Sequence, residues 1–541
     1  MALIKCLEIH QVIQKLCLVF KMQVLECSFD DLKINLLDVE SLSNISNKYT
    51  VFLGENGTGK SETLRQIINN ILRLKIKDID FYKSTIEGKF SYRDPLDSFL
   101  SNNYKNNLVE KNIKSSVKIL INQCICLDLS YEKTNGSRKI KSFDGKYITI
   151  SSGEFRHKFS IRSNNENNRY EIYNLIKDIN VIAISESCHI KFPLIQDDDL
   201  LNYYYPGHLK ESDKNYFDKY ELDKTVILKD KNIILSILKS GLRENKNKLK
   251  DIFDILKIQF RLKIETTSSE NIRNNLKNLS KNYFDSIAID KRDNFLNLEE
   301  CVLWYENQDL SNNKDIFNKN IRKSQIFDID LYENNRVIYF LYNLISNNLI
   351  NISNIYFYKN DKEVTLQDMS SGQLCLINSF CAIAADIKDE SLIFIDEPEI
   401  SLHPLWASKY IGLLQTLFSE FCNCHFIIAT HSPHIVSNLP DDDAFVVTIK
   451  DDRTSKCIPS NNFNFRSIDF QLAEVFDFPG NKNEYLVRII MLILTKISEK
   501  KGLNQDDLDT VNHLKNFLPK LEDKDPVKHL INQISALVDN E

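Results

Sequence analysis

The chain reads Gly54-Glu55-Asn56-Gly57-Thr58-Gly59-Lys60-Ser61 at the point where an apolar strand pattern, Thr50–Leu53, gives way to a helical pattern from about Lys60 to Leu74. This stretch matches the phosphate-binding pattern GxxxxGK[ST]. Its glycines let the backbone curl so that successive N–H groups point at phosphate oxygens, and the following helix adds its positive N-terminal dipole. Lys60 places a charge on the β- and γ-phosphates, and the Ser61 hydroxyl completes a Mg²⁺ coordination sphere. The stretch therefore predicts a site for a nucleoside triphosphate with Mg²⁺.

The glycine content makes this match specific. The chain has only 13 glycines in 541 residues, and three of them lie between Gly54 and Gly59. With glycine this rare, a chance occurrence of the pattern in a chain of this length is on the order of one in a few hundred. The strand before the loop and the helix after it reduce that chance further.

Length and composition set outer limits on the protein class. At roughly 150 residues per domain, 541 residues predict three to four units, or one large domain with insertions. Apolar residues make up 43% and charged residues 27%, which excludes a largely disordered chain. The net charge of −6 excludes a strongly basic protein, although a local basic patch is compatible with it. The N-terminus lacks the unbroken apolar segment of a signal peptide, and we expect a cytoplasmic protein without a membrane segment or disulfides.

Four zones follow one another along the chain: 1–85, 86–340, 341–480 and 481–541. The first combines short strands with the glycine loop and its helix, and the third returns to alternating strands and helices. The second begins with strands and continues into a helical section at Lys229–Phe260, where apolar residues recur at helical spacing. The fourth reads as two or three amphipathic helices. The strands expected with the clearest apolar patterns are Gln23–Phe29, Lys33–Leu37, Lys48–Leu53, Asn180–Ile184, Ser391–Ile395 and His425–Ala429.

The third zone supplies the second half of a nucleotide site. The apolar run that starts at Leu392 ends in two adjacent carboxylates, Asp396 and Glu397. At the end of a strand, Asp396 can hold Mg²⁺, and Glu397 can orient or deprotonate an attacking water, a role worth about 10²–10⁴ in rate. A strand that merely stops at charged residues would look the same in isolation. Gly372, 24 residues before Asp396, and His431, 35 residues after it, provide the context that such a strand would lack.

These motifs resemble the ABC-type ATPases in both order and spacing. The order is phosphate-binding loop, a signature at Met369-Ser370-Ser371-Gly372-Gln373, a Walker B strand with a following glutamate, and a switch histidine. Met369 and Ser371 depart from the usual LSGGQ signature, a variation that suits the SMC, RecF and OLD-type branch, as does the segment Glu399–Pro404. The resemblance implies an α/β fold: an ABC-type P-loop ATPase head with a mixed sheet and flanking helices, a large α-rich insertion and a helical C-terminal tail.

The resemblance also implies how the head works. Two heads dimerise head to tail, so that the signature of one, with Ser370, Gly372 and Gln373, contacts the ATP held by the other. Ser370 would cap the γ-phosphate bound by Lys60 of the partner copy, and His431 would contact the same phosphate. Such heads usually carry a glutamine where their two lobes join. Gln123 and Gln196 are both candidates for that glutamine.

The length of the insertion narrows the branch. About 300 residues separate the phosphate-binding loop from the signature, far more than a transporter head contains. The insertion has no sustained heptad repeat like that of an SMC coiled coil. OLD-type nucleases carry a metal-binding nuclease domain after the switch histidine, whereas only 110 residues follow His431, and Asp441–Asp443 reads as a solvated loop. We therefore expect no nuclease site in this chain.

One further segment resembles the ATPases of bacterial antiphage systems. Val181–Ser185 followed by Lys191-Phe192-Pro193 is similar to the Septu-type ATPase PtuA, including its retron-associated forms. That resemblance implies an ATPase that works with a separate HNH nuclease, PtuB. It also allows a higher oligomer, and a reverse transcriptase with its single-stranded DNA or RNA as further partners. The tail would then dock a partner or cover the head. The alternative is a RecF- or SMC-like DNA-binding ATPase of recombination or repair.

Overall fold

The structure is a computed structural model, and it describes the backbone alone for 22, 29, 32, 224–230, 324 and those residues between 113 and 163 that it describes. Its central elements match the predicted strands closely, since β3 and β16 have the predicted bounds and β15 is shifted by one residue. The described segments are 22–29, 32–37, 46–54, 59–72, 113–121, 125–135, 142–143, 147–152, 155–163, 179–186, 192, 203–204, 224–243, 246–268, 272, 276, 298–308, 324–449, 454–463, 466–499 and 502–538.

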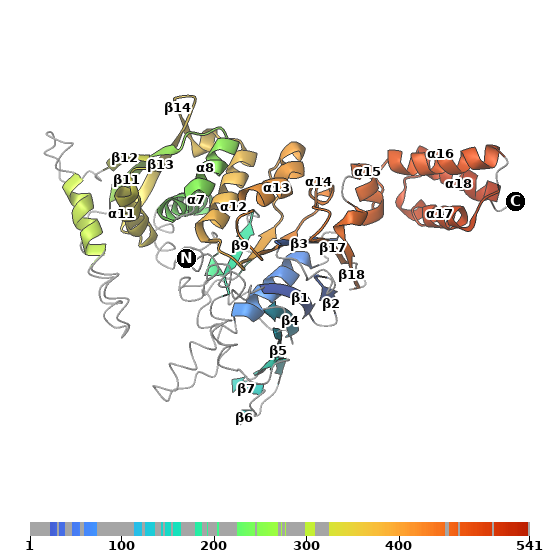
Figure 1. The fold of residues 1–541 in the computed structure, drawn as a ribbon, viewed down its shortest axis with the longest axis horizontal. Coiled ribbons are helices and arrows are strands. Elements are labelled where there is room, and N and C mark those ends of the chain that lie inside the picture. Colours follow the sequence, from blue (N-terminus) through green and yellow to red (C-terminus); the bar gives the residue numbers. More distant parts are fainter. Residues whose placement is uncertain are drawn as a thin grey trace, which may run out of the picture.

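A seven-stranded sheet in the order β10-β9-β15-β16-β3-β17-β18 carries the predicted motifs (Figure 1). All neighbouring pairs from β10 to β17 are parallel, and β17 pairs antiparallel with β18. The strands β3, β15 and β16 are buried along their whole length, which is typical of parallel strands covered on both faces. Because parallel strands end at one edge, the loops after these three strands meet there. The strands are β3 (Lys48–Leu53), β9 (Val181–Ser185), β10 (Tyr203–Tyr204), β15 (Leu392–Asp396), β16 (His425–Ala429), β17 (Ala444–Ile449) and β18 (Ser455–Pro459).

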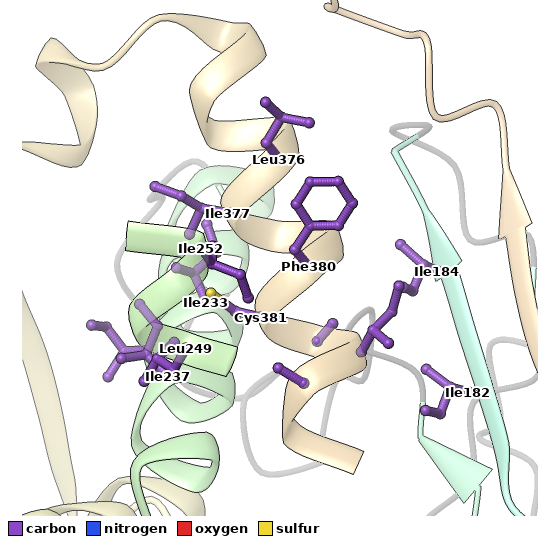
Figure 2. Packing of buried hydrophobic residues seen from close by; sticks show 14 of the residues in the cluster. Ile182, Ile184, Ile233, Ile237, Leu249, Ile252, Leu376, Ile377, Phe380 and Cys381 are labelled. Atoms are coloured by element: carbon purple, nitrogen blue, oxygen red, sulfur yellow. The ribbon is translucent and has the colours of Figure 1, made fainter. Parts of the chain in front are cut away.

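Helix α12 (Ser371–Asp386) lies between the sheet and two further helices, α7 (Lys224–Leu242) and α8 (Lys246–Ile255). Figure 2 shows Phe380 on the side of α12 that faces β9, while α7 and α8 cover the opposite side. Almost the whole of α12 is buried, so this helix is fixed from both sides. The helical section predicted at 229–260 consists of two helices, because α7 ends at Leu242 and α8 runs from Lys246 to Ile255, before the chain enters β11 (Arg261–Ser268).

A second, antiparallel sheet has the order β2-β1-β4-β5-β8-β7-β6. Its strands β4 to β8 come from the predicted insertion, whose described part holds strands β4 to β12 besides its helices. The sequence predicts strands at the beginning of this insertion, and β4, β5 and β7 lie there. The strands are β1 (Met22–Phe29), β2 (Leu32–Asn35), β4 (Ile113–Ile121), β5 (Ile125–Asn135), β6 (Ser142–Phe143), β7 (Tyr147–Ser152) and β8 (Phe155–Ser163).

A buried histidine joins the two sheets. The backbone N–H of Val24 in β1 donates to His425 Nδ1 over 3.3 Å, so Nδ1 carries no proton and Nε2 does. The Nε2–H then donates to Thr50 Oγ1 over 2.9 Å, and the Thr50 hydroxyl donates to the carbonyl of Leu36 over 3.0 Å. This directed chain requires a neutral imidazole. Burial, and secondly the charge of Lys48, lower the pKa of His425 from 6.5 to about 3.

We expect this histidine to make the fold acid-sensitive. Since its folded pKa lies below its unfolded value, the unfolded chain binds the extra proton, and the free energy of unfolding falls as the pH drops from 6.5 towards 3. Between pH 6 and 5, His425→Gln should reduce that slope by about 1 kcal/mol per pH unit, measured by urea unfolding. The exposed His529→Gln serves as the control. An unchanged slope in His425→Gln would contradict the prediction.

A third, four-stranded antiparallel sheet, in the order β12-β11-β13-β14, lies on the other side of α7 and α8 with helix α11 (Asn335–Ser346) (Figure 1). The outer face of this sheet pairs its own charges. Arg261 bonds Asp328, and Lys263 bonds Glu363 over 3.0 Å. The remaining strands are β12 (Ser324–Asp330), β13 (Ile350–Lys359) and β14 (Lys362–Thr365).

The C-terminal zone contains three helices, α16 (Glu484–Ser498), α17 (Gln505–Lys515) and α18 (Pro526–Val538), at one end of the molecule (Figure 1). They enclose a core of their own, separate from the main core of the molecule. Met491 and Leu492 on α16 are exposed. Among the helices that the structure describes, none is both long and apolar enough to cross a membrane.

Candidate active site

The phosphate-binding loop starts where β3 ends. Gly59 has φ +91°, a backbone conformation that residues other than glycine adopt only at an energetic cost. A Cβ at this position would meet no neighbouring atom, so the backbone angle and not the space favours glycine. The helix at 60–72 begins directly after it, and both the N–H and the hydroxyl of Thr63 donate to the Gly59 carbonyl. The Lys60 ammonium group folds back along the loop and donates to the Gly54 carbonyl over 2.8 Å. In the described part of the loop, a left-handed Gly59 is thus followed directly by a helix.

Some predicted residues fall outside the part of the chain that the structure describes. In the phosphate-binding loop these are Asn56, Gly57 and Thr58, and for the lobe-joining glutamine they are Gln123 and Gln196. Their expected roles stay predictions.

Ser61 and Asp396 meet across the sheet. Asp396 is the last residue of β15 and is fully buried, while Ser61 is the second residue of the helix after β3. Strand β16 lies between their strands, yet the Ser61 hydroxyl donates to Asp396 Oδ1 over 2.8 Å. A hydroxyl beside a carboxylate is a pair of hard oxygen donors, and Mg²⁺ is usually held by such groups together with substrate phosphates. The two residues therefore fit the predicted magnesium site.

Glu397 occupies a tight turn directly after β15. Its φ is +52°, which costs a side-chain-bearing residue about 1 kcal/mol or more and is typical of functional loops. The Glu397 N–H donates to the carbonyl of Ala429, the last residue of β16, over 2.8 Å. This bond extends the ladder between the two strands by one residue beyond the edge of the sheet. Its side chain is half-buried, so it is open to a ligand at that edge.

His431 follows β16 at the same edge. The N–H of Thr430 donates to the carbonyl of Phe52 in β3, and the N–H of His431 donates to Glu399 Oε1 over 2.6 Å. Burial raises the pKa of Glu399, against the effect of that hydrogen bond. The structure thus places His431 close to the loop that contains Glu397. Sequence reasoning gave Glu399 no role, although its place two residues after Glu397 was visible.

The signature forms the beginning of α12. Ser370 is the N-cap: its hydroxyl accepts the N–H of Gln373, and Gln373 Oε1 accepts the N–H of Ser370, each over 3.3 Å. A Cβ on Gly372 would lie 3.4 Å from the carbonyl oxygen of Ser401, so this position packs closely against the loop after β15. Ser370 and Ser371 are exposed. The start of this helix is therefore a capped N-terminus that faces outward, away from the buried body of α12.

Glu186 anchors the middle of that helix to the sheet. It follows Ser185, the residue of β9 that pairs with Asp396, and sequence reasoning did not select it. One of its carboxylate oxygens accepts hydrogen bonds from Asn378 Nδ2 over 2.8 Å and from the Ser379 hydroxyl over 3.1 Å. Asn378 and Ser379 are buried in α12. Glu186 therefore fixes α12 next to β15.

Glu186→Ala should destabilise the protein by about 2–3 kcal/mol, because it leaves two buried donors without their acceptor. Glu186→Gln keeps an acceptor oxygen and should recover most of that loss. Urea unfolding of the two variants measures the difference. A loss below about 0.5 kcal/mol in Glu186→Ala would show that the contact contributes little.

Comparisons with known proteins found a family model and similar proteins. The family model of the AAA ATPase domain matches residues 34–436. The retron Vc95 probable ATPase of Vibrio cholerae serotype O1 biovar El Tor is 23% identical over 457 residues, which cover 79% of this chain and 75% of that protein. The Septu protein PtuA of Bacillus mycoides (strain KBAB4) is 23% identical over 244 residues, 42% of this chain and 30% of that protein. An Smc head domain of Pyrococcus furiosus aligns over 81% of this chain and 96% of its own with 11% identity, but its TM-score of 0.28 carries no structural argument.

Proposed function

The chain belongs to the AAA ATPase domain family, and from this premise we propose that it binds ATP with Mg²⁺ at the edge formed by the loops after β3, β15 and β16 and hydrolyses it there. The observation that carries the proposal is the hydrogen bond of 2.8 Å between Ser61 and Asp396, which joins two distant motifs. Both residues would hold Mg²⁺, which neutralises phosphate charge when bound. Lys60 would leave the Gly54 carbonyl and bind the β- and γ-phosphates.

Glu397 is the proposed base of the reaction. It follows Asp396 directly and is half-buried at the same edge. A carboxylate there can accept the proton of the attacking water while Lys60 and the helix N-terminus hold the phosphates. His431, bound through its backbone to the same loop, would contact the γ-phosphate and respond to its loss.

Two copies would form the complete ATPase. The exposed, capped N-terminus of α12 carries Ser370, and free N–H groups at a helix N-terminus attract phosphate. In a head-to-tail homodimer, Ser370 of one copy would cap the γ-phosphate held by the other, with Gly372 and Gln373 beside it. ATP would then favour the closed dimer, and hydrolysis would release it.

We place this ATPase in a bacterial antiphage complex, as the subunit that controls a separate HNH nuclease of the PtuB kind. The similarity to a retron ATPase and to a Septu PtuA protein supports that placement. The nuclease site would come from the other chain, and a retron reverse transcriptase with its single-stranded DNA is a further partner. Docking would use the C-terminal helices, where Met491 and Leu492 are exposed while the inner face of α16 is buried.

Purification of tagged Glu397→Gln protein from its native host tests the defence role. A stoichiometric nuclease should co-purify, and Met491→Glu with Leu492→Glu should release it without changing ATP turnover of the chain alone, since both side chains are exposed. A bare dimer that carries only heterogeneous DNA would overturn the proposal and favour a RecF-like clamp. Mass spectrometry and nucleic-acid analysis of the purified material distinguish the two.

A further inference from the structure

Glu399 connects the loop after β15 to the loop after β16 through a side-chain hydrogen bond. Backbone pairing between β15 and β16 runs from Leu392 to Asp396, and the N–H of Glu397 adds one more bond, to Ala429. The recorded backbone pairing between these two strands ends there. The Glu399 carboxylate reaches across the gap and accepts the N–H of His431 over 2.6 Å, between residues 32 positions apart in the sequence. A side chain thus continues the connection where the backbone ladder ends.

The loop that carries Glu399 is held on its other side by the signature helix. Its turn is closed by hydrogen bonds from Ile400 to the Glu397 carbonyl and from Leu402 to the Glu399 carbonyl. Cys375 Sγ of α12 donates to the Pro398 carbonyl over 3.4 Å. Because α12 and the turn fix the backbone of Glu399, its carboxylate has a fixed position relative to the loop after β16, which carries His431.

The carboxylate is also kept out of bulk solvent. Burial is the largest influence on Glu399 and raises its pKa, whereas the N–H of His431 and the hydroxyl of Thr430 stabilise the charged form. Its second oxygen, Oε2, is buried without a hydrogen-bond partner among the described residues. Burying a carboxylate is costly unless hydrogen bonds compensate for the lost water, and the bond that Oε1 accepts from the His431 N–H is one such compensation.

We propose that Glu399 is the positioning residue of the switch histidine: it fixes the backbone of His431 relative to Glu397, so that base and γ-phosphate sensor keep one geometry. The proposal rests on the proposed hydrolysis at this edge. Glu399 touches neither ATP nor water in this role; it acts through His431. Loss of its acceptor oxygen should therefore affect turnover, while ATP binding by Lys60 and the phosphate-binding loop stays intact.

Amide hydrogen exchange tests the contact without any turnover. In Glu399→Ala, the His431 amide should exchange about tenfold faster or more, because its buried acceptor is gone. In Glu399→Gln, the amide oxygen keeps the acceptor, and exchange should stay within about threefold of the original protein. Unchanged exchange in Glu399→Ala would overturn the proposal, whether or not the protein hydrolyses ATP.

Turnover tests the role. Glu399→Ala should lower kcat about 10- to 100-fold with an ATP Kd within about twofold, and Glu399→Gln should recover most of kcat. The double variant of Glu399→Ala and His431→Ala should be no slower than His431→Ala alone, because both changes remove one function. The proposal would be overturned if the kcat losses of the two single variants multiplied in the double variant. It would also be overturned if the lower kcat of Glu399→Ala were fully explained by the fraction of that variant that is unfolded. Absence of turnover in the original protein would count against the proposed ATPase, and the exchange result would still decide on Glu399. Glu363→Ala, an exposed change on β14, is the control.

Discussion

Glu397→Gln should lower ATP turnover by about 10²–10⁴-fold while the protein still binds ATP. The substitution keeps the size of the side chain and removes its ability to accept a proton from water. The neighbouring Asp396, bonded to Ser61, is untouched, so the Mg²⁺ and phosphate contacts should survive. Turnover is measured by phosphate release, and binding by the increase in unfolding temperature with ATP and Mg²⁺. The variant should also accumulate as a closed dimer, visible by light scattering, because it retains ATP.

Glu390→Gln is the matched control for this prediction. Glu390 stands just before β15 as Glu397 stands just after it, and it too has a positive φ, of 66°. Burial raises the pKa of Glu390 to about 7, yet this carboxylate does not lie at the carboxyl end of the strand. Its replacement should leave turnover unchanged. Normal turnover in Glu397→Gln would remove the assignment of the base.

The sequence predicts the parts of this fold that local patterns determine. The strands β3 and β16 have the predicted bounds, because each is a continuous apolar run between polar segments and is buried on both faces. The glycine pattern likewise predicts a turn between β3 and the next helix, and Gly59 in that turn has a positive φ. Such features depend on neighbours in the sequence, and a single sequence therefore suffices to find them.

Features that depend on distant partners were not predictable. Glu186 accepts a hydrogen bond from Asn378, which is 192 residues away in the sequence, and Glu399 accepts one from the His431 N–H. Both are carboxylates near the ends of strands, and nothing in the sequence distinguishes them from solvated turn residues. His425 reads as part of an apolar strand, whereas its buried, neutral ring joins two sheets through Val24 and Thr50.

The break between α7 and α8 illustrates a different limit. Apolar residues keep a helical spacing on both sides of it, because both helices bury one face against α12 (Figure 2). A periodic pattern reports which face is buried, and it does not report where one helix stops and the next begins. The separation at 243–245 carries no proline, and its only nearby glycine, Gly241, lies inside α7.

Lys60→Ala should abolish nucleotide binding. Lys60 supplies the positive charge of the phosphate-binding loop. Its ammonium group lies along that loop and donates to the Gly54 carbonyl. Without it, the charge on the β- and γ-phosphates faces only the backbone N–H groups and Mg²⁺. We expect the ATP Kd to rise by about 100-fold or more, equivalent to about 2.7 kcal/mol.

Unfolding experiments separate this loss of binding from a loss of structure. A ligand at 100 times its Kd stabilises a protein by about 2.7 kcal/mol, so the original protein should gain that much with ATP and Mg²⁺ and Lys60→Ala almost nothing. Without nucleotide the two should unfold alike to within about 1 kcal/mol, because a hydrogen bond such as that from Lys60 to the Gly54 carbonyl contributes about that much. Lys263→Ala, on the third sheet, should keep the full gain. If ATP stabilised Lys60→Ala as much as the original protein, the phosphates would bind elsewhere. Ser61, Asp396 and Glu397 would then lose their proposed roles.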